Sequence, residues 1–534
     1  MRDMLSPFKN EPFTDFNDAA TKRNMIEALE RVGGELGRKY GLMIGGQRVG
    51  SAQSFSSTNP ARPAQVIGTH PEATVEIAEQ AVQAALAAFP EWSRTAVGER
   101  VDLLLRAAAL IRERHLEFCA WLTFEVGKNW AEADADVGEC IDFLEFYARE
   151  ALRLAGATTP IQMPGERNML RYVPVGGSAV IPPWNFPFAI MAGMTAAAIV
   201  CGNTVVLKPS PDAPTIAARF VALLEEVGLP DGVVNLVQGG PAVGQAIVEH
   251  PQVRLIAFTG SKKVGLEIHE RVARTQPGQH FIKRTILEMG GKDSIIVAAD
   301  ADIDSAIEGV TASAFGFSGQ KCSACSRVIV DAAVYDVFCD RLRERVGTLA
   351  SGDPAENFYS GPVINKVAYD RVLRYIDIGK SEGRLLVGGA AIENADAGYY
   401  IAPTVFADIA PDARLAQEEI FGPVLAVIKS EGFDDALAIA NNTEYGLTGA
   451  IYSGSREKLD RARDEFHVGN LYLNRKCTGA MVGAHPFGGF NMSGTDSKAG
   501  GPDYLTLFTQ AKSVAEKLGA VSPAVEEQEE RMGL

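Results

Sequence analysis

The fold is decided by residues 178–207, which read SAVIPPWNFPFAIMAGMTAAAIVCGNTVVL. The short apolar runs at the two ends of this stretch, 178–181 and 204–207, have the length and composition of buried strands. The uncharged residues 188–200 between them form a pattern that is typical of a buried helix. A strand, a helix and a second strand in this order predict a parallel pair joined by a crossover helix, the building unit of α/β proteins.

The same region raises the question of a membrane span, because residues 172–207 contain no charged side chain. Prolines interrupt it at positions 182, 183 and 187, and a Gly-Asn pair interrupts it again at 202–203. The longest unbroken apolar run is therefore shorter than the roughly 20 residues that a bilayer-spanning helix needs. We interpret the region as strand, turn, buried helix and strand.

The alternation of strands and helices continues beyond this stretch. Nearby, strands are expected at 233–237 and 254–258, with helices at 213–227, 241–250 and 262–274. A second alternating region begins near residue 285, with strands expected at 294–297, 327–331, 424–428 and 449–452 and helices at 303–313, 334–349 and 434–441. Two α/β units in succession predict a ligand cleft between them. Residues 1–40 are expected to form a helical arm.

Bulk composition narrows the functional classes. A chain of 534 residues is too long for a single core, so two or three domains are expected. Its 51 Lys and Arg against 67 Asp and Glu give a net charge of −16, which disfavours nucleic acid and anionic membranes as partners. The seven cysteines have no zinc-site spacing, so no metal is expected, and they suit a reducing cytoplasm. The first residues lack the apolar core of a signal peptide, so a cytoplasmic location is expected.

Two short segments carry candidate reactive groups. In GFSGQKCS, residues 316–323, Cys322 follows a glycine-containing loop and a lysine, and backbone dipoles and a cation favour the reactive thiolate. In LEMGGK, residues 287–292, Glu288 lies between an apolar strand and two glycines, where desolvation would make it a general base. Taken singly, each residue also has a structural interpretation. Cys322 could be an inert core cysteine, and Glu288 could be a charge at a strand end or a member of a salt bridge.

Two further segments suggest binding of charge. Asn185 lies among the rigid, uncharged residues of PPWNFP, 182–187, and could either hold an oxyanion or satisfy the backbone of a turn. Ser261 ends FTGS, 258–261, between an expected strand and an expected helix, where a helix N-terminus favours phosphate. As a four-residue string the second signal is weak.

Together these segments resemble the aldehyde dehydrogenase superfamily. The resemblance extends from about residue 41 to 517 and includes, in order, PWNFP (183–187), VVLKPS (205–210), FTGS (258–261), LEMGGKD (287–293), GQKCSA (319–324), EEIFGPV (418–424), NTEYGLTG (442–449) and PFGG (486–489). It implies the α/β fold of that family, with a Rossmann-like cofactor domain, an α/β catalytic domain and a β oligomerisation arm. The NAD-binding domain, with the helical arm, would consist of residues 1–151 and 175–285. The catalytic domain would consist of residues 286–502. The oligomerisation arm would combine residues 152–174 with 503–518, and residues 519–534 would form an acidic tail.

The resemblance also implies catalytic roles. Cys322 would attack the aldehyde carbonyl, and the Asn185 side chain with the Cys322 backbone N–H would hold the oxyanion. Loss of hydride would leave a thioester, and Glu288 would activate the water that hydrolyses it. Covalent attachment divides one difficult step into two easier ones.

The cofactor implied by the resemblance is NAD. The implied cofactor-binding residues are Trp184, Lys208, Gly240, Gly244, Ser261, Glu419 and Phe421. The sequence departs from the family pattern at Pro211, where many members carry a glutamate that accepts hydrogen bonds from the ribose 2′-hydroxyl. A proline removes that acceptor and its charge, so NADP remains possible.

Three longer strings resemble the branch of 1-pyrroline-5-carboxylate dehydrogenases, which act on L-glutamate γ-semialdehyde in the second step of proline catabolism. They are EVGKNWAEADADVGECIDF (125–143), GFSGQKCSACSR (316–327) and FHVGNLYLNRKCTGAMVGAHPFGGFNMSGT (466–495). The resemblance implies that Glu139 binds the substrate ammonium. It implies that the carboxylate is bound by Ser323 and the backbone of Gly479 and Ala480, and that the aliphatic chain packs between Phe186 and Phe487. It also implies a homodimer or an assembly of dimers.

Three alternatives remain open. The substrate could be another semialdehyde, of succinate or aminoadipate, although a substrate without an ammonium has no use for Glu139. The chain could be an inactive binding protein of the same fold, although retention of Cys322, Glu288 and Asn185 argues against this. A DNA-binding regulator is disfavoured by the net charge of −16 and by the absence of a basic recognition segment.

Overall fold

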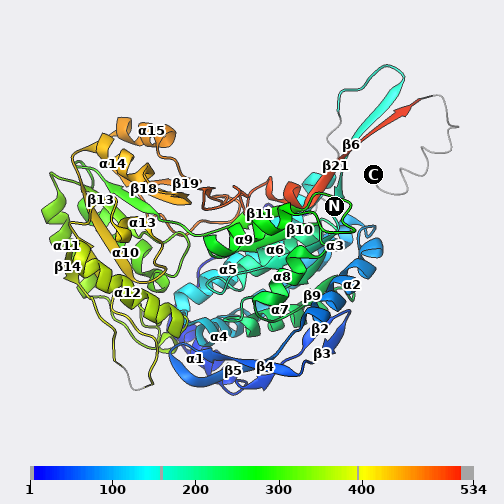
Figure 1. Cartoon of the computed structure of the whole chain (residues 1–534), viewed down its shortest axis with the longest axis horizontal. Coiled ribbons are helices and arrows are strands. Elements are labelled where there is room, and N and C mark those ends of the chain that lie inside the picture. Colours follow the sequence, from blue (N-terminus) through cyan, green and yellow to red (C-terminus); the bar gives the residue numbers. More distant parts are fainter. Residues whose placement is uncertain (1–4, 157–159, 394–395, 519–534) are drawn as a thin grey trace.

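Two seven-stranded β-sheets organise the molecule, and Figure 1 shows them in two lobes of an elongated body. The computed structural model describes residues 5–156, 160–393 and 396–518. The expected acidic tail at 519–534 therefore lies outside the described residues, as does part of the expected oligomerisation arm, at 157–159.

The first sheet has the strand order β11-β10-β7-β8-β9-β2-β3, and its central strands are parallel. The bounds are β2 Leu42–Ile44, β3 Gln47–Val49, β7 Gly177–Ile181, β8 Thr204–Leu207, β9 Val234–Leu236, β10 Leu255–Thr259 and β11 Arg284–Glu288. The expected strands at 178–181, 204–207, 233–237 and 254–258 are thereby confirmed, and β2 and β3 add an antiparallel edge.

Helix α6 (Ala189–Val200) connects β7 to β8, and nearly every one of its residues is buried. Helices α7 (Pro214–Glu226), α8 (Pro241–Glu249) and α9 (Lys262–Ala273) follow β8, β9 and β10. This confirms the crossover predicted from the uncharged stretch. Within the described residues, no helix combines the length and apolarity that crossing a membrane requires.

The register of β10 and β11 aligns the ends of two segments that the sequence singled out. The strands pair in parallel from Leu255 opposite Arg284 to Thr259 opposite Glu288. Glu288 and the FTGS turn therefore emerge at the same edge of the first sheet.

The second sheet has the order β14-β15-β16-β13-β12-β18-β19. Its strands are β12 Ser294–Val297, β13 Arg327–Asp331, β14 Arg384–Val387, β15 Thr404–Ala407, β16 Val424–Ser430, β18 Thr448–Tyr452 and β19 Asn470–Leu473. Its helices are α10 Ile303–Phe315, α11 Tyr335–Gly347, α12 Lys366–Glu382, α13 Arg414–Gln417, α14 Phe433–Asn441 and α15 Arg456–Glu465. Every strand and helix expected in this region is present, and β14, β15, β19, α12, α13 and α15 are additional.

The N-terminal part differs from the expected helical arm. From residue 5 to residue 40, only α1 (Ala19–Gly33) is helical, and residues 6–15 before it are extended. Pro7 and Pro12 explain this, because proline disrupts helical hydrogen bonding. A three-stranded sheet of β1 (Arg38–Lys39), β4 (Gln53–Asn59) and β5 (Arg62–Glu72) follows.

Between β5 and β6 the chain forms the helices α2 (Val75–Trp92), α3 (Val97–Glu113), α4 (His115–Val126) and α5 (Trp130–Ala155). The chain turns sharply between α4 and α5 at Gly127, which has a φ of +72°. The Asn129 side chain then caps α5 by accepting a hydrogen bond of 3.0 Å from the Glu132 N–H. The long helix α5 packs on α6 and carries several residues of the candidate site.

A two-stranded ribbon projects from the body, as both figures show. Strand β6 (Glu166–Pro174) pairs in antiparallel fashion with β21 (Thr509–Lys517) along their full lengths. These segments fall within the two expected halves of the oligomerisation arm.

Candidate active site

Cys322 lies in a loop between α10 and β13 whose backbone is unusual. Phe317 and Ser318 have positive φ values of 49° and 53°, a conformation that costs free energy in residues other than glycine. Hydrogen bonds hold this loop: the Ser318 hydroxyl donates to the Gly361 carbonyl at 2.7 Å, and the Gln320 side chain accepts from the Ile364 N–H at 2.8 Å. The loop therefore presents Cys322 from a fixed backbone.

The thiol of Cys322 is half-buried and borders a cavity of about 390 Å³. Burial, together with the negative charges of Asp293, Glu288 and Glu419, raises the pKa of Cys322. We expected Lys321 to favour the thiolate, and this is wrong in the structure. The Lys321 ammonium is 2.7 Å from the Glu132 carboxylate, so its charge is paired with that carboxylate, and the pKa of the thiol is raised.

Glu288 is the last residue of β11 and borders the same cavity. Burial raises the pKa of its carboxyl to about 7, against the effect of three hydrogen-bond donors. These donors are the Ser497 hydroxyl at 2.7 Å, the Ser497 N–H at 3.3 Å and the Gly489 N–H at 3.3 Å. A carboxylate with a pKa near neutrality, in fixed position beside a thiol, has the properties of a general base.

Asn185 lies in the β7–α6 connection and contacts the cysteine loop. Its side-chain amide donates a hydrogen bond of 3.1 Å to the Gln320 carbonyl. An amide carries two N–H donors, so one is available for another acceptor. Among the described residues, the backbone N–H of Cys322 has no acceptor either. One free donor thus lies on the cysteine loop and the other on the segment that contacts this loop.

The cavity brings together all the substrate-binding residues that the resemblance implied. Glu139, Phe186, Ser323, Gly479, Ala480 and Phe487 line it together with Cys322 and Glu288. Burial raises the pKa of Glu139 to about 8. Within the described chain, neither the Gly479 nor the Ala480 N–H donates to another residue, and Gly479 has a φ of +77°. These N–H groups remain free to bind an anion.

The expected cofactor residues form two groups. On the first sheet, Lys208 follows β8 and its side chain packs against Gly244, where an added Cβ would lie 3.4 Å from the lysine methylenes. Gly240 precedes α8 and Ser261 precedes α9, so both lie at helix starts beyond the carboxyl ends of parallel strands. Ser261 also caps α9 by accepting from the Val264 N–H at 3.4 Å.

The second group consists of Trp184, Glu419 and Phe421. The Trp184 and Phe421 rings meet edge to face with centroids 5.6 Å apart. The partly buried Glu419 carboxylate accepts a hydrogen bond from the Gly291 N–H at 3.2 Å, and desolvation raises its pKa. A side chain at Gly290 would overlap this carboxylate, at 2.2 Å from a Cβ, which explains the glycine there.

Comparison with known proteins agrees with this geometry. The model of the aldehyde dehydrogenase family matches residues 48–514, which is most of the chain. The chain belongs to the aldehyde dehydrogenase family. The fold of this aldehyde dehydrogenase is accordingly that of its family, and the fold expected from the sequence is confirmed.

Relatives and solved structures are similar along almost the whole chain. The 1-pyrroline-5-carboxylate dehydrogenase of Geobacillus thermodenitrificans is 56% identical over 515 residues, covering 96% of this chain and all of that protein. The 1-pyrroline-5-carboxylate dehydrogenase 2 of Bacillus subtilis is 54% identical over the same share. The structure of a 1-pyrroline-5-carboxylate dehydrogenase from Thermus with bound NAD superposes with a TM-score of 0.95 at 50% identity, covering 96% of this chain and all of that one.

The structure also reveals residues of this aldehyde dehydrogenase that the sequence did not single out. Ser497 orients Glu288, and no local pattern indicated a contact across 209 positions. Lys128 is fully buried, pairs with Asp136 at 2.9 Å and lies 3.6 Å from the centre of the Phe186 ring. The sequence contained one indication of this pair. Lys128 lies just before α5 and Asp136 lies within its first turns, and a buried charge requires a partner of opposite sign.

Proposed function

We propose that this aldehyde dehydrogenase oxidises L-glutamate γ-semialdehyde, formed by hydrolysis of 1-pyrroline-5-carboxylate, to L-glutamate with NAD. This is the second oxidation of proline catabolism. The observation that carries the proposal is the cavity itself, because it joins a thiol and a base to an acidic side chain and two free backbone N–H groups. The names and 50–56% identity of the relatives support it.

The reaction begins with attack of the Cys322 sulfur on the aldehyde carbon. The thiol gives its proton to water, the carbon–sulfur bond forms as the carbonyl π bond breaks, and the carbonyl oxygen becomes an oxyanion that the Asn185 amide and the Cys322 N–H stabilise. Departure of hydride from this thiohemiacetal leaves a thioester on Cys322. Glu288 then takes a proton from water, and the resulting hydroxide attacks the thioester, releases L-glutamate and restores the thiol.

Several residues fit NAD as the cofactor, whose chemistry is acceptance of the hydride. Burial lowers the pKa of Lys208 to about 8, and its ammonium contacts the Pro209 carbonyl at 3.4 Å, so hydrogen-bonding capacity is left for a ribose. Glu419 likewise has capacity for the second ribose, since a carboxylate accepts several hydrogen bonds. Gly240, Gly244 and Ser261 would border the adenosine and pyrophosphate, with Trp184 and Phe421 at the nicotinamide end.

The groups that recognise the substrate suit an α-amino acid. Glu139 would pair with the ammonium, and Ser323 with the N–H groups of Gly479 and Ala480 would bind the carboxylate. Phe186 and Phe487 would enclose the aliphatic chain between this end and the thiol. The half-buried carboxylate of Glu139 would have no cationic partner with succinate semialdehyde, which is the alternative substrate.

Replacement of Glu139 by Ala tests the recognition of the amino group. We expect kcat/KM for L-glutamate γ-semialdehyde to fall. The loss should correspond to about 1–3 kcal/mol of transition-state stabilisation, because a charge-assisted contact is lost. Oxidation of propanal, which has no ammonium, should change little. Ser323→Ala should act in the same direction but more mildly, since two N–H groups remain. Equal losses on both aldehydes in the Glu139 variant would make that residue structural.

The pKa of Glu139 adds a pH dependence to the same test. The carboxylate binds an ammonium and the protonated acid does not, so affinity should increase as the pH rises toward 8. Inhibition of propanal oxidation by L-glutamate measures this directly. The inhibition constant should decrease from pH 6 to 8 in the wild type, and this decrease should be absent in Glu139→Ala.

A second prediction concerns Pro211 and the preference for NAD over NADP. It is exposed after β8, in the turn where many family members carry a glutamate. Pro211→Glu introduces a carboxylate that repels a 2′-phosphate. We expect kcat/KM with NADP to fall roughly tenfold or more while that with NAD is maintained. A parallel fall with both cofactors would indicate that position 211 is remote from the ribose.

Formation of NADH with 1-pyrroline-5-carboxylate and with succinate semialdehyde tests the proposed function as a whole. The first substrate should be strongly preferred. Preference for succinate semialdehyde would overturn the substrate, and no activity with either aldehyde would favour an inactive protein of this fold.

We also infer an oligomer of dimers or a dimer, formed through the ribbon of β6 and β21. The ribbon projects from the body. The segment that leads into β6 carries exposed apolar side chains, including Ile161, which is 88% exposed, and Met163. Such surfaces are typical of contacts with another subunit. The seven free cysteines suit work in the reducing cytoplasm.

A further inference from the structure

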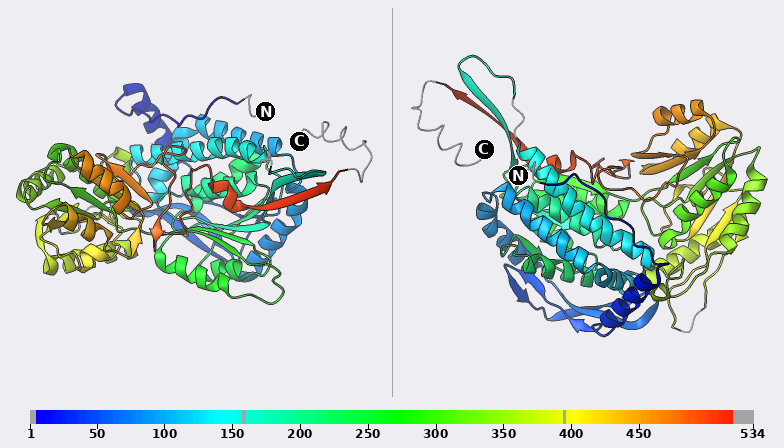
Figure 2. Two further views of the ribbon diagram at one scale, coloured as in Figure 1. Left: turned by 90° about the horizontal axis from the view of Figure 1, so that it is seen from above. Right: turned by 180° about the vertical axis from the view of Figure 1, so that it is seen from behind.

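The extended residues before α1 follow the surface of α5 as a strap, which we define as residues 8–16. Figure 2 shows this part of the chain crossing the cyan helices in the view from behind. Aromatic contacts fix its two ends: Phe8 meets Phe146 at 5.2 Å between ring centroids, and Phe16 meets Trp130 at 5.5 Å. The strap therefore spans most of the length of α5.

Two buried aspartates of α5 hold the strap between these ends. Asp142 accepts from the Asn10 side-chain amide at 2.8 Å and from the Glu11 N–H at 2.7 Å. Asp134 accepts from the Thr14 N–H at 3.0 Å. Hydrogen bonds from backbone N–H groups to carboxylates are among the stronger kinds in proteins, so the path of the strap is well defined.

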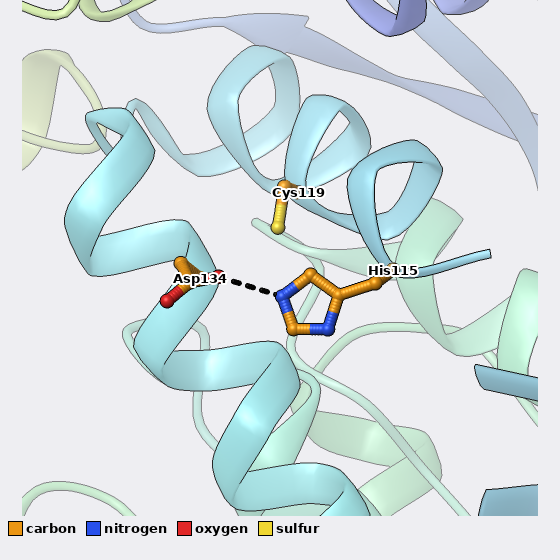
Figure 3. A group of neighbouring side chains, drawn as sticks. All are labelled: His115, Cys119 and Asp134. Carbon is orange, nitrogen blue, oxygen red and sulfur yellow. Dashed lines mark hydrogen bonds and ion pairs between the residues drawn. The ribbon is translucent and has the colours of Figure 1, made fainter. Parts of the chain in front are cut away.

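Asp134 also belongs to a group with His115 and Cys119, drawn in Figure 3, whose potential ligand atoms lie within 4.8 Å of one another. The His115 ring nitrogen is 2.7 Å from one Asp134 oxygen, and the Thr14 N–H occupies the other. Both oxygens of Asp134 are thus engaged by protein groups. This arrangement suits an anchor for the strap better than a metal site.

The strap reaches the substrate cavity and the loop that would bind the carboxylate. Residues 11–14 line the cavity beside α5. The Asn10 amide donates to the Val482 carbonyl at 2.9 Å while it also donates to Asp142. Phe8 lies so close to Gly483 that an added Cβ would be 3.1 Å from its ring. Asn10 therefore links α5 directly to the segment 478–482, which we call the carboxylate loop.

The carboxylate loop is supported from its other side by Arg475. The Arg475 guanidinium donates to the carbonyls of Thr478 at 3.3 Å and Gly479 at 3.1 Å. With carbonyls at both ends of the loop engaged, its backbone is held where the N–H groups of Gly479 and Ala480 stay free. Loss of one support would let these donors move, and binding that depends on placed donors is sensitive to such movement.

We propose that the strap is a specificity element of the active site, in which Asn10 positions the carboxylate loop for the amino-acid end of the substrate. This inference rests on the proposed function. It assigns Asn10 a positioning role that does not touch the reacting atoms. Replacing Asn10 should therefore weaken the binding of the charged end of the substrate and leave the rate of the reaction at Cys322 unchanged.

Asn10→Ala tests this role, with Asn17→Ala as the matched control, since Asn17 is exposed and bonds only locally to Asp15. We expect Asn10→Ala to raise KM for L-glutamate γ-semialdehyde and the inhibition constant of L-glutamate about five- to tenfold. The kcat values and KM for propanal and NAD should remain unchanged. Asn17→Ala should match the wild type throughout.

A second variant, Phe8→Ala, removes the apolar support at Gly483 and should produce the same selective rise. If Asn10→Ala lowers activity on propanal equally, or leaves L-glutamate inhibition unchanged, the strap has no role in specificity. A failure of the proposed function gives a different result, because the wild type itself would then neither oxidise L-glutamate γ-semialdehyde nor be inhibited by L-glutamate.

Discussion

Cys322→Ala is expected to lower the oxidation of all aldehydes by at least about 10⁴-fold, because no other group can form the thioester. Binding of NAD should be retained, since the cofactor residues lie on other segments of the chain. Both quantities are accessible by initial-rate measurement and by fluorescence titration with NADH. The variant removes a single sulfur from a loop whose backbone is fixed by Ser318 and Gln320, so the fold should persist.

Cys325 provides the matched control for this prediction. It lies three residues further on, is buried and donates a hydrogen bond of 3.3 Å to the Arg327 carbonyl. Cys325→Ala should therefore leave activity almost unchanged. An inactive Cys325 variant together with an active Cys322 variant would reverse the assignment of the nucleophile.

Glu288→Gln is expected to slow turnover by about 10²- to 10⁴-fold while leaving the first hydride transfer fast. Only hydrolysis of the thioester needs an activated water. Rapid mixing should therefore show a burst of NADH close to the enzyme concentration, followed by slow release. A loss of the burst would mean that Glu288 acts before thioester formation.

The pKa of Glu288, near 7, adds a signature that the wild type should display. The ionised carboxylate is the active base, so the rate of thioester hydrolysis should rise as the pH increases through about 7 and level off above it. The Gln variant has no ionisable group there and should lose this rise. Single-turnover decay of the acyl-enzyme across pH 6 to 8 measures the difference.

The sequence predicted those parts of the fold whose residues are apolar and locally periodic. The run at 178–207 is the clearest case, because its two strands and its helix are buried on all sides and carry no charge. The polar, largely exposed strand β4 and its mostly half-buried partner β5 have no such signature and were missed, since their stability depends on pairing with each other. The same holds for the extended strap, which depends on contacts with α5.

Within the site, motif residues could be predicted and their electrostatics could not. Cys322, Glu288 and the six substrate residues line one cavity, as the motifs implied. The pairing of Lys321 with Glu132 crosses 189 positions and engages the charge that was expected to favour the thiolate. Such long-range contacts depend on the packing of α5 against the cysteine loop, and no local pattern contains that information.

The register of β10 and β11 has a consequence for how the length of this protein can vary during evolution. Side chains alternate between the faces of a strand, so deleting one residue within β11 would turn Glu288 away from Cys322. A deletion in the connection at 275–280, which lies outside both strands, would leave the pairing of Thr259 with Glu288 intact. Insertions and deletions should therefore accumulate in that connection among descendants of this chain, while the two strands keep a constant length.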